Sequence, residues 1–392
     1  MRSFPVCILQ DLHKDQHILT QDSDTRLLTW FSPCVWGDAD GYTTIRRFYH
    51  ETAVGRAIVN GFWWALGNDV KGLNNYDSHS EVKKLTPWSN PMFTASSFSI
   101  LNFPTNFFDL LKNGTVNVHI ADIVRLSPHK VHLSNGTQLK TDVLCCATGW
   151  KHIPPLKFLP EGIEKELGLP HIPSDDDSEE PVWKSELVHR ADQEILTRFP
   201  RLKDQPIQNK NLKPITETKG VSATDKMSDP ATPLTPFTLY RLTVPPSARF
   251  LRTRDIAFAG FLMSFSTIPI APIQSLWICA YMDDELSTKV VPSPKSLLDN
   301  NVDSSNEGGK TMEEIRYETV LYSRFGKWRY PAGHGAQFPD FIFDAQPYMD
   351  MLIADLGLKV HRKKGMLAEW LEPYGIEDYP DLVAEWTATS RV

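Results

Sequence analysis

The feature that most constrains the fold is an apolar run that ends in small residues. Residues 143–147 read Val-Leu-Cys-Cys-Ala, and Thr148, Gly149 and Trp150 follow directly. A strand that is apolar on both faces is typical of the centre of a parallel sheet. Ligands of open α/β folds bind at the carboxyl ends of such strands, and the small Ala147 and Gly149 would let backbone approach a cofactor closely. These residues predict either a cofactor edge in an α/β fold or simply a strand that ends in a tight turn.

A hairpin pattern precedes this run and favours the cofactor interpretation. Residues 116–120 alternate Val, Val and Ile with polar neighbours, as in a half-buried strand. Residues 131–133 indicate a second strand, and Asn135-Gly136 suits the positive φ angles of a tight hairpin turn. The sequence therefore predicts a strand–hairpin–strand unit that leads into Ala147.

A second signal lies between residues 255 and 281. Asp255 to Gly260 reads as a short buried strand that ends on glycine, and Pro272 opens an apolar helix that runs to about Tyr281. Proline suits a first helical turn because the amide hydrogen that it lacks would have no partner there. The free amide groups of that helix start, beside Gln274, would suit an electron-rich ring edge or a phosphate. A buried core helix accounts for the same residues.

The uncharged stretch from Ile256 to Met282 is also long enough to cross a bilayer. Pro269 and Pro272 would break one continuous helix, however. A strand, a loop and a buried helix explain the stretch better, and we predict no integral membrane segment.

Composition and charge argue against several classes of protein. The chain has 392 residues with 41% hydrophobic content, which suits a globular protein, and its formal charge of −7 argues against nucleic-acid binding. Its five scattered cysteines include no Cys-x-x-Cys pair, so neither a disulfide framework nor a structural zinc site is predicted. His13 and His17 have no evident third ligand, and no metal site is predicted there either. This cysteine usage indicates a reducing compartment, and we expect a cytoplasmic location.

Patterns along the chain predict helices and polar surface segments. Apolar residues recur at helical spacing over residues 42–69, 107–111, 311–321 and 347–358. Three stretches lack the apolar residues of a packed element, at residues 174–180, 203–236 and 292–310.

Together these segments resemble the flavin-containing monooxygenases, especially their fungal branch. That family joins its domains by an Ala-Thr-Gly-aromatic motif after a strand–hairpin–strand unit, and residues 147–150 match it with Ala-Thr-Gly-Trp. The final strand and helix of the family's flavin domain resemble residues 255–281. In this resemblance Gly260 lies where the strand ends, and Gln274 lies where the helix start faces the flavin ring.

The resemblance implies an α/β fold, a partial two-dinucleotide-binding-domain (Rossmann-like) flavoprotein with helical and irregular additions. Residues 1–150 would be a remnant of the nicotinamide-binding domain and residues 151–250 a connecting, partly irregular segment. Residues 251–392 would be the C-terminal part of the FAD-binding domain, with a polar insertion at about 292–310. The resemblance also assigns the cofactor-binding residues: Ala147, Thr148, Gly149, Gly260 and Gln274.

The sequence departs from the family in its glycine pattern. Family members carry two Gly-x-Gly-x-x-Gly loops, one for FAD and one for NADPH, and none of the 21 glycines here has that spacing. Without such a loop the pyrophosphate loses its backbone cradle. The chain therefore looks like a monooxygenase that begins inside its nicotinamide domain, and we expect weak or no FAD binding by these residues alone.

The resemblance implies an FAD- and NADPH-dependent monooxygenase that acts on a small lipophilic molecule in fungal secondary metabolism. In that family NADPH reduces the flavin, which captures oxygen. Because the cofactor carries the chemistry and the protein positions and shields it, no catalytic residue is assigned. One alternative is a non-catalytic relative that serves as an interaction partner. Another is a half-enzyme that needs a second chain to supply the missing glycine loops, so the expected partners include a second chain or a homo-oligomer.

Overall fold

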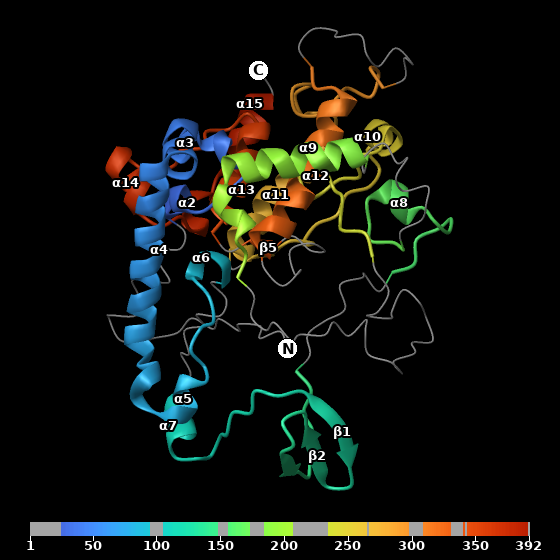
Figure 1. Cartoon of the computed structure of the whole chain (residues 1–392). Coiled ribbons are helices and arrows are strands. Elements are labelled where there is room, and N and C mark those ends of the chain that lie inside the picture. The colour runs from blue at the N-terminus through green and yellow to red at the C-terminus, as the bar shows by residue number, and fades with distance from the viewer. Residues whose placement is uncertain are drawn as a thin grey trace. The chain divides into compact units, whose positions relative to one another are not determined.

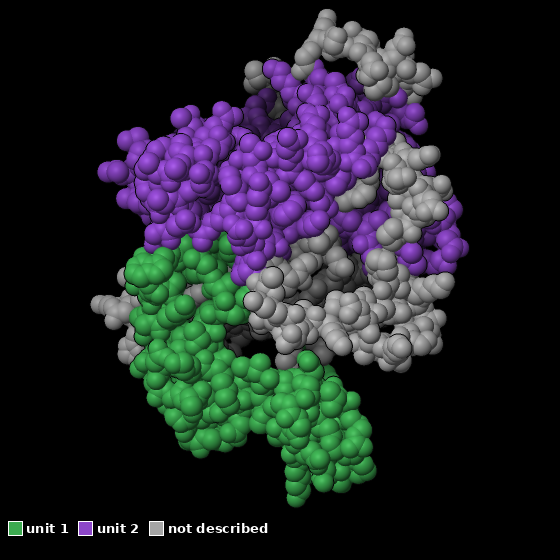
Figure 2. Space-filling view, in the orientation of Figure 1, with its two compact units in different colours: residues 1–12, 63–150 green, residues 13–62, 151–392 purple. Residues whose placement is uncertain are grey.

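The computed structural model describes residues 25–94, 105–147, 156–172, 184–206, 234–264, 266–297, 309–330, 340–341 and 343–390. The chain forms two compact units, which Figure 2 distinguishes by colour. Unit 1 contains residues 1–12 and 63–150, and unit 2 contains residues 13–62 and 151–392.

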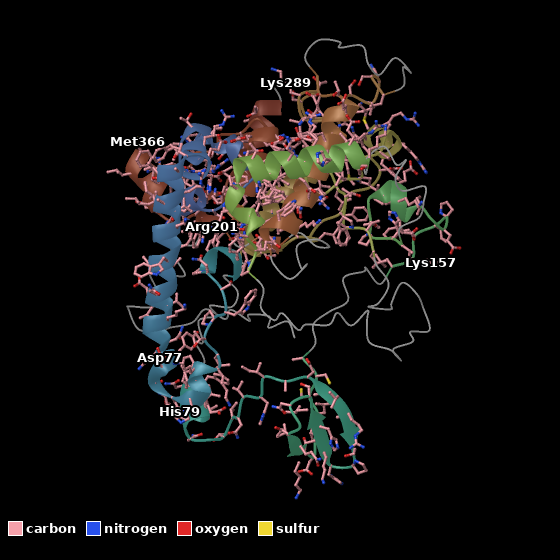
Figure 3. The ribbon with its side chains drawn as sticks, viewed as in Figure 1. Asp77, His79, Lys157, Arg201, Lys289 and Met366 are labelled. Atoms are coloured by element: carbon pink, nitrogen blue, oxygen red, sulfur yellow. The ribbon has the colours of Figure 1, made fainter. Side chains whose placement is uncertain are left out.

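Unit 1 combines short helices with a small sheet. Its elements are the later part of α4 (Ala53–Asn74), η3 (Tyr76–Ser78), α5 (Ser80–Lys83), α6 (Pro91–Thr94), α7 (Phe107–Lys112), β1 (Ile123–Ser127), β2 (Lys130–Leu133) and β3 (Gln138–Lys140). His79 caps α5, since its Nδ1 accepts a hydrogen bond from the amide of Glu81 at 3.2 Å (Figure 3). A small apolar core forms around the buried side chains of Tyr76, Val82 and Leu111.

The sheet of unit 1 is an antiparallel meander in the order β1-β2-β3. It confirms the predicted strand at residues 131–133 and the turn at Asn135-Gly136, where Gly136 has a φ of 83°. The predicted strand at residues 116–120 is wrong. Val116 and Val118 instead pack against the small helical core, and the amide of Val118 donates to Glu81 at 2.9 Å. The two valines of this alternating pattern therefore pack against helices, and Ile120 is exposed.

The predicted central strand at residues 143–147 is also absent from the described sheets. All five residues are exposed, and Val143 is 79% exposed. The apolar run follows β3 directly but forms no ladder with it. The apolar side chains of this run favour burial, but a strand also needs neighbouring strands to pair with, and the run has none among the described strands.

Unit 2 is mainly helical. Its helices include α2 (Arg26–Phe31), η2 (Gly37–Asp40), α3 (Thr43–Glu51), α8 (Glu164–Leu167), α9 (Ser185–Arg198), η6 (Pro200–Lys203), α10 (Ala248–Thr253), α11 (Thr267–Met282), α12 (Met312–Arg329), α13 (Ala345–Asp355), α14 (Met366–Leu371), η10 (Ile376–Asp378) and α15 (Leu382–Ser390). The strands β4 (Met263–Ser264) and β5 (Asp340–Phe341) form a short parallel pair. In Figure 1, α9 runs across α12, and α11 and α13 lie against each other.

Helix prediction succeeded where apolar spacing was regular. The helices α7, α12 and α13 confirm the predictions at residues 107–111, 311–321 and 347–358. The segment predicted as one helix over residues 42–69 is divided into α3 and α4 by Thr52, which has an extended conformation. The Thr52 hydroxyl accepts a hydrogen bond from the amide of Gly55 at 3.0 Å, so the break also starts the next helix.

A capping box starts α12. Thr311 Oγ1 accepts from the amide of Glu314 at 3.2 Å, and the amide of Thr311 donates to the Glu314 carboxylate at 2.7 Å. We expect Thr311→Ala to lower the free energy of unfolding by about 1 kcal/mol, because it removes the cap. Urea unfolding measures this, with the exposed Thr389→Ala as a control that changes stability by less than about 0.5 kcal/mol. Equal losses in the two variants would contradict a capping role.

The second predicted signal differs from its expected form. Residues 255–260 form no strand, although the amide of Phe258 donates to Thr243 O at 2.8 Å. The helix begins at Thr267, earlier than the expected Pro272. Pro269 lies in the first turn of this helix. Because Pro272 has no amide hydrogen, the carbonyl of Ile268 lacks a helical partner, but Ile268 is an exposed residue of the first turn. Among the described helices, none combines the length and apolar composition that a bilayer crossing requires.

A buried ion cluster joins distant parts of unit 2. Arg26 on α2 is fully buried and donates to Asp350 at 2.5 Å, to Glu369 at 2.7 Å and to Asp40 at 3.4 Å. Tyr374 accepts a further bond from Arg26 at 3.1 Å. Burial would lower the pKa of Arg26, but Asp350 and Tyr374 together raise that pKa above its ordinary value. Arg26 therefore stays charged inside the core.

Candidate functional site

Two of the predicted cofactor-binding residues, Gly260 and Gln274, are joined directly. Gln274 lies on α11 with its side chain buried, and its Oε1 accepts a hydrogen bond from the amide nitrogen of Gly260 at 3.1 Å. Because a backbone N–H can only donate, the side-chain atom that faces it must be the amide oxygen. This contact therefore determines which way the Gln274 amide points.

The other end of the same amide meets two hydroxyl groups. Nε2 of Gln274 donates to Thr243 Oγ1 and to Tyr348 Oη, each at 3.1 Å. Both hydroxyls donate in turn to the carbonyl oxygen of Arg241, at 3.1 Å from Thr243 and 2.8 Å from Tyr348. The five residues Gly260, Gln274, Thr243, Tyr348 and Arg241 are called the Gln274 network below. Every polar atom of its central side chain has a partner.

Gly260 forms the open end of the network. Its φ of 75° lies in the left-handed region that glycine adopts without strain. A Cβ built at this position would meet no atom within 4 Å, and the residue is exposed. A flat ligand can therefore approach the backbone at this turn, whereas the Gln274 side chain itself is enclosed.

A strained turn forms the closed end of the network. Arg241 and Leu242 have φ angles of 52° and 56°, although neither is glycine. Tyr240 and Val244 exchange backbone hydrogen bonds of 2.8 and 3.0 Å across the turn. Residues with side chains adopt positive φ angles at a cost, so Arg241 and Leu242 need tertiary contacts to hold this conformation.

The Arg241 guanidinium supplies much of that support. It makes a bidentate contact with Asp355 at 2.8 and 3.1 Å, and it donates to Glu318 at 3.1 Å and to Tyr322 at 2.9 Å. Burial would lower the pKa of Arg241, but Asp355 is the main partner that raises it well above its ordinary value. Burial also raises the pKa of Tyr348 to about 12, so its hydroxyl remains a donor at neutral pH.

The other predicted cofactor-binding residues lie in the other unit or outside the described residues. Ala147 is exposed and belongs to unit 1, whereas the Gln274 network belongs to unit 2. Thr148 and Gly149 lie outside the described residues. Within the described ranges, no group of three or more His, Cys, Asp or Glu side chains is arranged to hold a metal ion.

The chain is similar over most of its length to curated fungal FAD-dependent monooxygenases. It is 28% identical over 376 residues to an FAD-dependent monooxygenase of Aspergillus nomiae, covering 94% of this chain and 58% of that protein. It is 28% identical over 353 residues to one of Pyrenophora dematioidea, covering 88% and 56%. A third, from Aspergillus sclerotiorum, is 28% identical over 377 residues, covering 94% and 58%.

These similarities support the resemblance to fungal FAD-dependent monooxygenases that the sequence motifs suggest. The chain spans little more than half the length of the curated relatives that it matches. No protein-family model matches the chain. No solved structure matches it either. Its mixture of helices with two small sheets is compatible with an α/β flavoprotein.

Three residues of the Gln274 network were not predicted as site residues from the sequence. Thr243 and Arg241 follow a stretch predicted to be polar and irregular, and Tyr348 falls in a predicted helix as an ordinary aromatic residue. A hydroxyl becomes recognisable as a partner of Gln274 only when the fold brings α11 and α13 together. The local sequence carried no signal for this contact.

Proposed function

We propose that the protein to which these residues belong is an FAD- and NADPH-dependent monooxygenase that oxygenates a small lipophilic molecule in fungal secondary metabolism. The observation that carries the proposal is the similarity to curated fungal FAD-dependent monooxygenases over 94% of the chain. The motifs that first suggested the family, at residues 147–150 and 255–281, support it independently of those comparisons.

Ala147, Thr148, Gly149, Gly260 and Gln274 are the residues that we propose to serve the cofactor. Gly260 fits a flat ring because the space beside its backbone is open. Gln274 would act indirectly on the same ring, because its amide oxygen accepts the hydrogen bond of the Gly260 amide and so holds the glycine in place. When bound and reduced, FAD supplies the oxygen-activating chemistry, and the protein groups bind, orient and shield it. We therefore assign no catalytic acid or base.

Several finer points belong to the same proposal. Residues 1–150 would derive from a nicotinamide-binding domain, residues 151–250 would connect, and residues 251–392 would complete the FAD-binding domain in a partial Rossmann-like arrangement. We propose a cytoplasmic location and an association with a partner chain or with a second copy. The exposed apolar side chains of Ile123, Val124, Leu126, Val143 and Leu144 would suit such an association.

The proposal predicts a flavin-dependent oxygen uptake. Protein isolated from its own host, at whatever length the cell makes it, should carry oxidised-flavin absorbance and consume oxygen when NADPH is added. The 392 residues expressed alone should bind FAD weakly or not at all, because their glycines form no Gly-x-Gly-x-x-Gly loop. Titration of FAD monitored by flavin fluorescence, together with an oxygen electrode, measures both.

The outcomes of this experiment separate the alternatives. A folded but colourless host protein that takes up no FAD would contradict the proposal and favour a non-catalytic relative. FAD binding that appears only when a partner chain is added would favour a partner-dependent enzyme. Tight, stoichiometric FAD uptake by the 392 residues alone would show that the expectation from the glycine pattern is wrong.

A further inference from the structure

The Gln274 network is a continuous hydrogen-bonded path from the carbonyl of a buried residue, Arg241, to the amide of an exposed glycine, Gly260. It starts at Arg241 O, passes through the Tyr348 hydroxyl and the Gln274 side chain, and ends at Gly260 N. The three steps measure 2.8, 3.1 and 3.1 Å. Since a hydrogen-bonded chain has a fixed donor order, a change at one end alters the partners available at the other.

Burial makes this path sensitive to the loss of any one group. Thr243 and Tyr348 are fully buried, and Gln274 is 3% exposed. A buried polar group is tolerated when all its hydrogen bonds are made, and it becomes costly when one partner is removed. The two hydrogens of Gln274 Nε2 need both hydroxyls. Removal of the Tyr348 hydroxyl would therefore leave an unsatisfied donor and let the amide move.

The strained turn shows that the buried end of the path is rigidly held. Arg241 and Leu242 keep positive φ angles despite their side chains. Such conformations persist where surrounding contacts determine them, and they occur preferentially at ligand-binding and switch regions. The Arg241 carbonyl accepts from both hydroxyls while the Arg241 guanidinium is held by Asp355. The path is thus anchored at one end and exposed at the other.

We propose that Tyr348 is a positioning residue for the Gly260 turn. Acting through Gln274, its hydroxyl holds the glycine amide, and with it the open side of the turn, in one orientation. Tyr348 itself is buried and would not touch a ligand. The claim that Tyr348 helps to position a flavin ring rests on the proposed function. The claim that Tyr348 holds the Gly260 amide does not depend on that function.

A purely structural role for Tyr348 is the alternative, and the same site offers a matched control. Tyr322 is also buried, and its hydroxyl accepts from the Arg241 guanidinium at 2.9 Å. The hydrogen bonds of Tyr322 are to Arg241 and Met351, not to Gln274. If Tyr348 merely stabilised the fold, loss of either hydroxyl would affect Gly260 equally.

Amide hydrogen exchange of the whole 392-residue chain, labelled with ¹⁵N, tests the proposal without any cofactor. In Tyr348→Phe the Gly260 amide should exchange about five- to tenfold faster than in the parent chain, as expected for the loss of one hydrogen-bonding group. In Tyr322→Phe the exchange of Gly260 should stay within about twofold of the parent. Unchanged exchange in Tyr348→Phe, or an equal increase in both variants, would overturn the proposal.

A second pair of variants covers the case in which Tyr348→Phe does not fold. Thr243→Val removes the other hydroxyl that binds Gln274 Nε2, with little change in shape, and it should also accelerate exchange at Gly260. Thr319→Val is its control, because Thr319 is equally buried and bonds only within α12, to Ile315 O. Equal exchange at Gly260 in these two variants would contradict the proposal.

The effect of Tyr348 on FAD binding is measured separately, on the protein at the length that its own host makes. Tyr348→Phe should raise the dissociation constant for FAD about tenfold and shift the flavin absorbance, whereas Tyr322→Phe should change neither. If none of the proteins binds FAD, the proposed function fails while the exchange result still decides the role of Tyr348. If FAD binds equally to both variants, the positioning of a flavin edge by Tyr348 is contradicted.

Discussion

Replacing Arg26 by methionine is expected to lower the free energy of unfolding by about 3–5 kcal/mol. The change leaves the carboxylates of Asp350, Glu369 and Asp40 buried together with their main cation removed. Arg46 still pairs with Asp40 at 2.6 Å, but it makes no ion pair with the other two. Breaking one member of a buried ion cluster costs more than losing an exposed pair, since the remaining charges have no water to solvate them.

Urea unfolding at neutral pH measures this loss. Arg249→Met is the matched control, because Arg249 pairs with Glu166 at 3.0 Å but is half exposed. That variant should lose less than about 1 kcal/mol, as surface pairs do. A similar small loss in both variants would show that the Arg26 cluster is not what holds α2 to α13 and α14.

Acidification should destabilise the protein through His50. Burial lowers the pKa of His50 from 6.5 to about 4, and the charge of Arg46 acts in the same direction, while the bond to Trp30 O opposes both. Between these two pH values the folded state binds fewer protons than the unfolded state, so stability falls as the pH falls. The contribution of His50 to this loss approaches about 3 kcal/mol near pH 4, since each pKa unit corresponds to about 1.4 kcal/mol.

The pH dependence of urea unfolding between about pH 7 and pH 4.5 tests this expectation. His50→Gln keeps a donor for Trp30 O, which His50 contacts through Nε2 at 3.0 Å, but it removes the titrating ring. Its stability should fall less steeply with acid than that of the parent chain. His189→Gln, at an exposed position on α9, should leave the slope unchanged. Parallel slopes for the parent and His50→Gln would contradict the assignment to His50.

Regular helices and the tight turn could be predicted because their signals are local. The spacing of apolar residues marks α12 and α13. Asn135-Gly136 marks the β2–β3 turn because its second residue needs a positive φ. In each case the physical cause lies within a few residues of its effect.

Strands were predicted less well because their partners are distant in sequence. The alternating pattern at residues 116–120 predicted a strand, yet Val116 and Val118 pack against the helical core of unit 1 and Ile120 is exposed. Residues 143–147 have a composition suited to a central strand but are exposed and unpaired among the described strands. Periodicity describes side chains, whereas a sheet also needs a neighbouring backbone to accept its hydrogen bonds.

The sequence by itself determined the family resemblance and the helices α7, α12 and α13, and it singled out Gly260 and Gln274 as candidates. Only the tertiary structure decided that Gln274 lies mid-helix, holds the Gly260 amide and depends on Tyr348. It also brought Arg26 to carboxylates more than three hundred residues away. The reason is physical: a helix or turn is specified by neighbouring residues, whereas a buried polar group needs partners that only the folded chain brings within hydrogen-bonding distance.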